Sequence, residues 1–155
     1  MADIKKVAVI GAGVMGAGIA AQIANAGVDV VLFDIVPKDG ADRTAIAKGA
    51  IDKLKKTKPA PLMHARNAKR ITPANTEDDL KKLGECDWII EVVIERLDIK
   101  QDLYKKIDKH RKKGSVVSSN TSTLPLATLV DGMPKAFQAD FMITHFFNPP
   151  AICGC

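Results

Sequence analysis

The sequence predicts an α/β protein built on a doubly wound, mainly parallel β-sheet. Three short runs, "KKVAVIG" (5–11), "VDVVLFD" (28–34) and "DWIIEVVI" (87–94), are apolar on both faces. Segments with helical character separate them. A strand that is apolar on both faces must be covered on both sides, and alternating helices supply that cover. Right-handed crossovers then give the doubly wound arrangement.

The first half of the chain is predicted to hold two of these strands, each followed by a helix. The segment Val14–Ala26 has small residues, isoleucines and no proline, and Gly27 follows it, so it reads as a helix. A second helix is predicted over Ala41–Lys56, with its apolar residues on one face, as a helical insertion after the second strand. Pro59 and Pro61 then interrupt the chain.

The second half repeats the alternation with shorter pieces. Thr76 is expected to cap a small helix over 77–84, and the amphipathic segment Asp98–Arg111 is expected to form a longer one that stops before Gly114. The further predicted elements are a short strand at 70–74, strands at 115–120 and 139–147, and a helical turn or two at 126–132.

Composition restricts the class of protein. The 155 residues, 46% of them hydrophobic, suffice for one domain with a core. No run is long enough for a membrane span and no signal peptide is evident, so we expect a cytoplasmic protein without a membrane partner. The three cysteines and three histidines form no metal-ligand pattern, and no metal site is predicted. The net charge of +5 suits an anionic partner, but no aromatic residues interleave with the lysines, which argues against nucleic acid.

A glycine-rich turn joins the first strand to the first helix. Gly11, Gly13 and Gly16 have the G-x-G-x-x-G spacing: the first permits a tight turn, the second a close approach of a pyrophosphate, and the third close helix packing. The helix N-terminus adds N–H groups and a partial positive charge. An ordinary strand–helix turn can carry the same glycines. The candidate cofactor-binding residues of this turn are Gly11, Ala12, Gly13, Val14, Met15 and Gly16.

An acidic residue at the end of the second strand favours the cofactor interpretation. Asp34 stands at about the spacing at which a carboxylate accepts hydrogen bonds from an adenine ribose. The two features together predict a Rossmann dinucleotide-binding domain. A carboxylate there repels a 2′-phosphate, so NAD is favoured over NADP, with FAD as a less favoured alternative.

Four motifs then resemble one family. "VAVIGAGVMGAGIA", "EVVIERLDIK", "SSNTSTLPL" and "HFFNPP" occur in the same order in the NAD-binding domain of the L-3-hydroxyacyl-CoA dehydrogenases of fatty-acid β-oxidation. The similarity covers Ile4 to Pro150. It implies an NAD-dependent enzyme that moves hydride between NAD and a 3-hydroxyacyl-CoA, giving the 3-ketoacyl-CoA. In relatives the domain stands in a two-domain enzyme or in a larger multifunctional one.

The resemblance also implies roles for single residues, each with a plainer alternative. His145 matches the catalytic base, but it could be a half-buried strand histidine. Ser122 matches a serine that contacts the substrate oxygen and the nicotinamide side, but it could cap a helix. Asn148 matches a residue near nicotinamide and substrate, but it could be a turn residue before Pro149. Glu95 and Lys100 match cofactor-lining positions, but they could form a surface pair. Asn120 is a weaker candidate in the same loop as Ser122, and the lysine-rich helical insertion corresponds to one that leans over the CoA portion.

The end of the chain departs from the family pattern. We expect residues 1–150 to form the NAD-binding domain and "AICGC" (151–155) to be a non-family tail, which loss of one nucleotide after Pro150 would produce. The glutamate that orients the histidine in relatives, twelve residues after it, and the C-terminal helical domain for substrate and dimerisation would then be absent. We therefore expect the chain to bind NAD(H), to turn over weakly or not at all, and to be open to self-association through an uncovered apolar face.

Two other functions stay open on the sequence. One is another NAD-dependent Rossmann dehydrogenase acting on a small hydroxy acid, although such enzymes are not expected to carry "SNTS" and "HFFNPP" together. The other is a non-catalytic NAD-binding module. The sequence does not distinguish acyl chain lengths.

Overall fold

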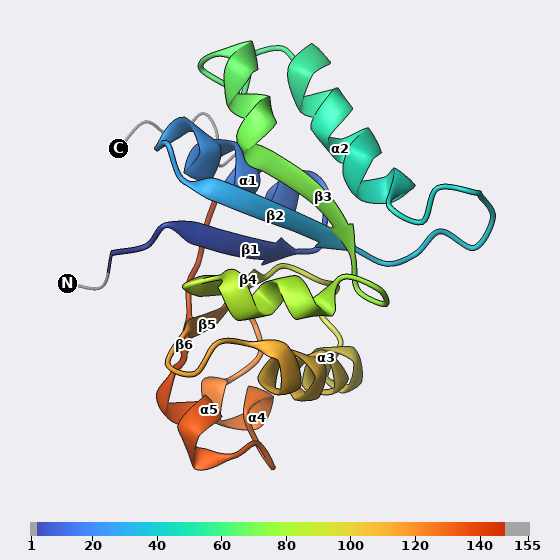
Figure 1. Ribbon diagram of the computed structural model, residues 1–155. Helices are drawn as coiled ribbons and strands as arrows, with labels where there is room; N and C mark the ends of the chain where they lie inside the picture. Colours follow the sequence, from blue (N-terminus) through green and yellow to red (C-terminus); the bar gives the residue numbers. More distant parts are fainter. Residues whose placement is uncertain (1–2, 148–155) are drawn as a thin grey trace.

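The structure is a computed structural model, and it describes residues 3–147 (Figure 1). One sheet with the strand order β3-β2-β1-β4-β5-β6 lies at its centre, and every neighbouring pair in it is parallel. This confirms the predicted doubly wound α/β fold. The strands are β1 (Lys6–Ile10), β2 (Asp29–Asp34), β3 (Ile71–Asn75), β4 (Trp88–Glu91), β5 (Val116–Ser119) and β6 (Phe141–Ile143).

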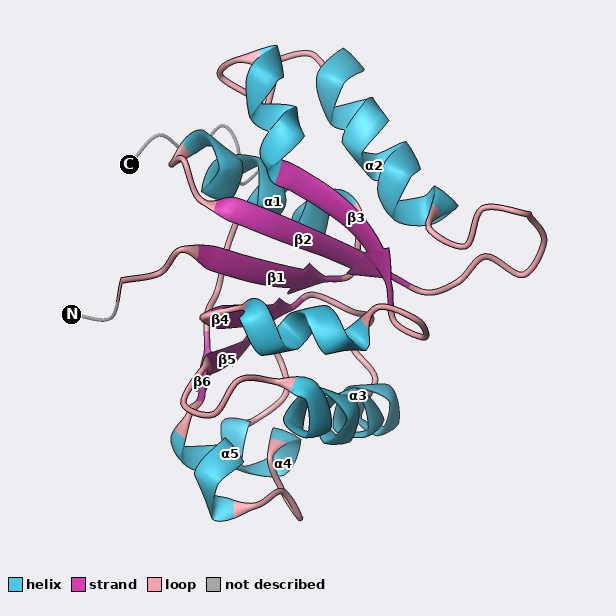
Figure 2. Ribbon diagram, in the orientation of Figure 1, coloured by secondary structure: helices cyan, strands magenta, loops and turns pink. Residues whose placement is uncertain are grey.

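Helices cover both faces of the sheet (Figure 2). The α-helices are α1 (Val14–Asn25), α2 (Ala45–Lys56), α3 (Leu97–His110), α4 (Leu126–Leu129) and α5 (Lys135–Ala139), and the 3-10 helices are η1 (Ala65–Arg70) and η2 (Leu80–Glu85). Across the described residues, no helix combines the length and the apolar character that a membrane span requires.

The alternation of side chains along β1 explains the two layers. Val7 and Val9 point into one hydrophobic core, which they share with α1, α2 and η1. Ala8 and Ile10 point into the other, which they share with η2, α3, α4 and α5. Both cores are fully buried at the sheet, so the central strands are apolar on both faces, as the sequence pattern predicts.

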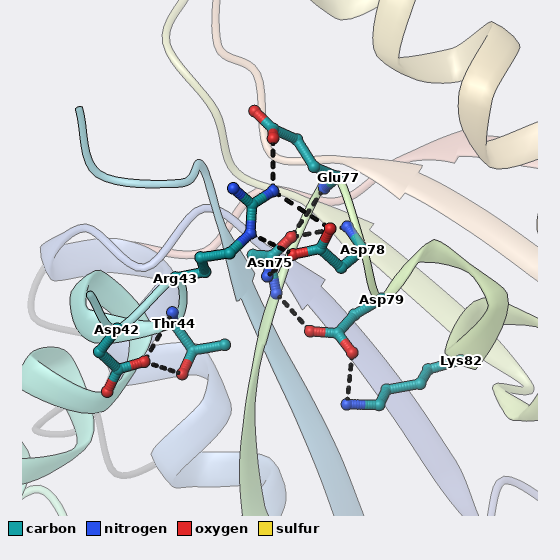
Figure 3. Close-up of polar contacts among 8 residues, drawn as sticks. All are labelled: Asp42, Arg43, Thr44, Asn75, Glu77, Asp78, Asp79 and Lys82. Carbon is teal, nitrogen blue, oxygen red and sulfur yellow. Dashed lines mark hydrogen bonds and ion pairs between the residues drawn. The ribbon is translucent and has the colours of Figure 1, made fainter. Parts of the chain in front are cut away.

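Two predicted helix starts were wrong, and polar side chains explain why (Figure 3). Thr76 does not cap a helix: the side-chain oxygen of Asn75 accepts the N–H groups of Glu77 and Asp78 at 2.9 and 2.7 Å, and η2 begins only at Leu80. The helix expected from Ala41 begins at Ala45, because the Asp42 carboxylate accepts both the N–H and the hydroxyl of Thr44 in a turn.

The last strand is also shorter than expected. The predicted strand over 139–147 is reduced to β6, because α5 includes Ala139 and the chain leaves the sheet after Ile143. Helices η1 and α5 were not predicted. The predicted domain boundary at Pro150 and the tail 151–155 lie outside the described residues and stay predictions.

Candidate functional site

The glycine turn is held by contacts that leave no room for side chains. A Cβ added at Gly16 would lie 1.7 Å from the carbonyl oxygen of Gly11, so only glycine lets α1 start this close to β1. Gly11 itself has a φ of +112°, and its added Cβ would lie 2.5 Å from the carbonyl oxygen of Val92. The turn is therefore packed tightly between α1 and the chain that leaves β4.

Gly13 contrasts with these two glycines. Its backbone is unstrained, with a φ of −65°, and an added Cβ would meet nothing within 4 Å. It precedes α1, whose first turn has no acidic residue and whose N-cap makes no side-chain hydrogen bond. The exposed side of Gly13 thus leaves the helix N-terminus accessible to an anionic group, as expected for a pyrophosphate. Val14 is exposed and Met15 is half-buried beside it.

Asp34 lies at the carboxyl end of β2, beside the glycine turn. Its Oδ2 accepts the N–H of Ala12 at 2.6 Å, and its Oδ1 accepts the N–H of Ile35 at 2.7 Å. A cavity of about 270 Å³ opens at this carboxylate. Its apolar walls include Ile35, Ile99 and Leu103, none of which was singled out from the sequence. The cavity matches an adenine flanked by apolar side chains with its ribose at Asp34.

Glu95 and Lys100 lie together, but not on the surface. The ammonium of Lys100 is 3.0 Å from Glu95 and 2.7 Å from Glu91, and the Lys100 side chain is 0% exposed. The alternative of a surface pair is therefore wrong. Glu95 has 38% of its side chain exposed, so it, and not Lys100, is accessible to a cofactor at this edge of the sheet.

Sequence reasoning missed the buried carboxylate that holds this pair. Glu91, at the end of β4, is fully buried, and its carboxylate accepts hydrogen bonds from the hydroxyls of Tyr104 and Ser119 at 2.7 and 2.6 Å. Burial and the adjacent Glu91 charge raise the pKa of Tyr104 well above its ordinary value. The signal was present: Glu91 is a lone carboxylate within an otherwise apolar strand, and such a group needs buried partners.

The loop after β5 is tied to Glu95. Its carboxylate accepts the Thr121 hydroxyl and, at 3.3 Å, the N–H of Ser122. Burial alone would raise the pKa of Glu95, but the hydrogen bonds from Thr121 and Lys100 outweigh it and lower that pKa. Thr121, not Ser122, accepts the Leu124 N–H at 3.2 Å, so the capping alternative for Ser122 fails. The Ser122 side chain is exposed.

His145 follows β6 and is exposed. Its ring stacks on Phe147, with ring centroids 4.9 Å apart, and it is outside the strand, so it is not the half-buried strand histidine of the alternative. Its neighbours are fixed: the N–H of Thr144 donates to the Ser119 carbonyl, and the N–H of Phe146 donates to Oδ1 of Asn120 at 2.8 Å. Asn120 therefore joins the Ser122 loop to the histidine segment. Asn148 lies outside the described residues.

The predicted residues thus form two groups at the carboxyl edge of one sheet. The glycine turn and Asp34 make one side, and Glu95, the loop 120–123 and His145 make the other. A family model described as "3-hydroxyacyl-CoA dehydrogenase, NAD binding domain" matches residues 6–154. The chain belongs to this family of NAD-binding domains. NAD is therefore its cofactor, and the open face of Gly13 and the cavity at Asp34 fit it.

Individual relatives agree with this assignment. Within the family, the chain is 49% identical over 160 residues to a probable 3-hydroxyacyl-CoA dehydrogenase of Bacillus subtilis and 50% identical over 147 residues to one of Deinococcus radiodurans. These alignments cover 94% and 95% of this chain but 20% and 42% of the relatives, so the chain spans less than half their length. The crystal structure of 3-hydroxybutyryl-CoA dehydrogenase from Escherichia coli superimposes with a TM-score of 0.80 at 28% identity, covering 97% of this chain and 31% of that one.

Proposed function

We propose that this domain serves a dehydrogenase that moves hydride between NAD and carbon 3 of an (S)-3-hydroxyacyl-CoA in cytoplasmic fatty-acid oxidation. The observation that supports it most is the pairing of the two groups at one sheet edge: a dinucleotide turn with Asp34 on one side, and the Ser122 loop with His145 on the other. The names of the relatives support the substrate class, and their greater length makes the activity a property of the longer proteins.

Each residue of the candidate site has a separate role in the proposed reaction. Bound NAD would supply the acceptor for the hydride of carbon 3. Asp34 accepts hydrogen bonds from the adenine ribose, and the N–H groups that follow Gly13 face the pyrophosphate. His145 removes the hydroxyl proton, for which an imidazole is suited because its ordinary pKa lies near neutrality. Ser122 donates to the substrate oxygen, and Asn148 is assigned to the nicotinamide and substrate region.

The helical insertion supports the CoA part of the proposal. Helix α2 presents three lysines in its last turn, Lys53, Lys55 and Lys56, and a shallow hollow of about 380 Å³ lies against it, lined in part by Lys53 and Lys56. Cations beside an open hollow suit the phosphates of an acyl-CoA.

Two measurements test the proposal. Titration of the chain with NADH should show saturable binding, and oxidation of NADH should be followed with acetoacetyl-CoA as substrate. In a protein that turns over, His145→Ala should lower kcat at least about 100-fold, because it removes the general base, while NADH binding stays within about twofold. Saturable NADH binding with loss of turnover in His145→Ala supports the assignment. Unchanged turnover would overturn the role of His145, and absent NADH binding would overturn the cofactor site.

A further inference from the structure

A buried carboxylate at the end of β4, which the proposed chemistry does not use, accepts hydrogen bonds from several elements. Glu91 is 0% exposed and receives four donors. Its Oε1 accepts the N–H of Val93 at 2.8 Å and the ammonium of Lys100 at 2.7 Å, and its Oε2 accepts the hydroxyls of Tyr104 and Ser119. These donors come from the chain after β4, from α3 and from β5, so one carboxylate fixes three elements against each other.

Lys100 connects the buried Glu91 to the exposed Glu95. It is also 0% exposed and lies between Glu91 at 2.7 Å and Glu95 at 3.0 Å. A buried ammonium needs a carboxylate partner, because its desolvation is otherwise uncompensated. With Glu91 in place, Lys100 is held at a fixed position and can orient Glu95, which is the exposed member of the three.

Glu95 in turn holds the loop. It accepts the Thr121 hydroxyl and the Ser122 N–H, and its Oε1 is 3.5 Å from the Thr123 hydroxyl. The backbone gives a second tie to Glu91, because the N–H of Asn120 donates to the Glu91 carbonyl at 2.8 Å. None of these contacts involves the glycine turn or Asp34.

We propose that Glu91 is a positioning residue that, through Lys100 and Glu95, holds the Ser122 loop in the geometry that receives the nicotinamide half of the cofactor. The inference rests on the proposed function for its placement of the nicotinamide beside this loop. It assigns to Glu91 a larger effect on the nicotinamide half of NAD, because Lys100 and Glu95 tie the Ser122 loop directly to Glu91, whereas the adenosine half at Asp34 meets the network only through Val93 and the α3 wall of its cavity.

The test compares NADH with ADP-ribose, which lacks the nicotinamide, by calorimetric titration. Glu91→Gln keeps the shape and lets Tyr104 and Ser119 reorient their hydroxyls, but it removes the charge that holds Lys100. We expect NADH affinity to fall about tenfold, because a displaced loop misaligns the groups around the nicotinamide. Affinity for ADP-ribose should stay within about twofold of the original chain. An equal fall for both ligands, or no fall for either, would overturn the proposal.

A matched control separates positioning from loss of stability. Ile107→Val removes one methyl group from the core on the same face of the sheet and leaves every hydrogen bond and ion pair of the Glu91 network in place, so it should lower the Tm without changing the NADH to ADP-ribose ratio. If Glu91→Gln does not fold, Ser119→Ala replaces it: loss of one donor to Glu91 should give a smaller fall of the same kind, confined to NADH. A fall in both ligands for Ser119→Ala would count against the proposal.

A double-mutant cycle tests the route through Lys100. In a Lys100→Met background, Glu91→Gln should add less than about twofold to the loss of NADH affinity, because both changes break the same chain of contacts. Additive losses would overturn the route. The proposed function can fail separately. If the unmodified chain binds neither NADH nor ADP-ribose, the cofactor site is wrong. If it binds both, and Glu91→Gln lowers both affinities equally, only the role of Glu91 is overturned.

Discussion

The two sides of the cofactor cleft achieve the same rigidity by different means. On the side of the glycine turn, position is set by backbone sterics: Gly16 approaches the Gly11 carbonyl so closely that no side chain fits, and the polar group, Asp34, is only half-buried. On the side of the Ser122 loop, position is set by buried charges, Glu91 and Lys100, that are 0% exposed. Steric positioning needs a short contiguous motif, whereas the buried charges require elements from distant parts of the chain.

The largest expected effect comes from adding a methyl group to the glycine turn, where backbone sterics set the position. Gly16→Ala places a Cβ 1.7 Å from a backbone oxygen that cannot move aside alone, so it should lower the free energy of unfolding by at least about 3 kcal/mol. Gly13→Ala is the matched control. Its added Cβ meets nothing within 4 Å, so the substitution should lower the free energy of unfolding by about 1 kcal/mol or less. It should still weaken NADH binding, because the methyl group crowds the pyrophosphate. Urea unfolding and NADH titration measure both effects. Equal stability of the two variants would contradict the steric account.

A smaller effect is expected at Asp34, the charged side chain beside the glycine turn. Asp34→Asn keeps the size of the side chain but loses one acceptor for the N–H groups of Ala12 and Ile35 and weakens the ribose contact, so NADH affinity should fall about tenfold. NADPH affinity should rise relative to NADH, because the repulsion of the 2′-phosphate is removed. Asp102→Asn is the control, since Asp102 lines the same cavity, and its NADH to NADPH ratio should not change. A ratio that responds equally to both substitutions would mean that general charge, not Asp34, sets the preference.

The smallest effect concerns a carboxylate far from the cleft. Asp87, just before β4, accepts the N–H groups of Lys5 and Lys6 and the ammonium of Lys112, with the Lys112 contact first in importance, and these lower its pKa from 3.8 to about 2. A lowered folded-state pKa stabilises the fold above about pH 4, and this contribution is lost as the pH falls toward 2. Asp87→Asn should therefore destabilise the chain at pH 7 and roughly half as much at pH 3, which lies midway through that loss.

Urea unfolding at the two pH values measures the Asp87 effect. The exposed Asp131→Asn is the control for a simple change in net charge. A destabilisation by Asp87→Asn of the same size at pH 3 and pH 7 would show that hydrogen-bond geometry, and not the charge, accounts for it. Neither substitution should alter NADH binding, because both residues lie away from the strand ends that form the cleft.

The same contrast explains what the sequence could reveal. The central strands, α1 and α3 were predicted to within one or two residues at most ends, because each is marked by its own apolar pattern. The glycine turn and Asp34 were found because their spacing along the chain is fixed. Helix α2 and η2 began later than predicted because Asp42 and Asn75 hold turns that helix periodicity does not encode.

The Glu91 network could not be predicted in the same way. Its partners Lys100, Tyr104 and Ser119 lie 9, 13 and 28 residues away, and only the parallel pairing of β4 with β5 brings Ser119 beside Glu91. For this reason the sequence left open a surface pair of Glu95 and Lys100, which the buried position of Lys100 excludes. The roles of Ser122, His145 and Asn148 stay predictions.

The pairing of β1 with β4 has a consequence for the order of folding. Strand β1 pairs with both β2 and β4: Val7 lies opposite Val30 of β2 and opposite Trp88 of β4. The connection from β1 to β2 is therefore much shorter than the one from β1 to β4. Joining β1 to β4 closes the longer loop, and long closures are entropically slower. The glycine turn and the Glu91 network lie on opposite sides of this β1–β4 seam, and the carbonyl of Val92 touches the turn across it. The cofactor site is therefore complete only when β4 has paired with β1, and a cofactor bound across the seam stabilises the folded state in which both halves are docked.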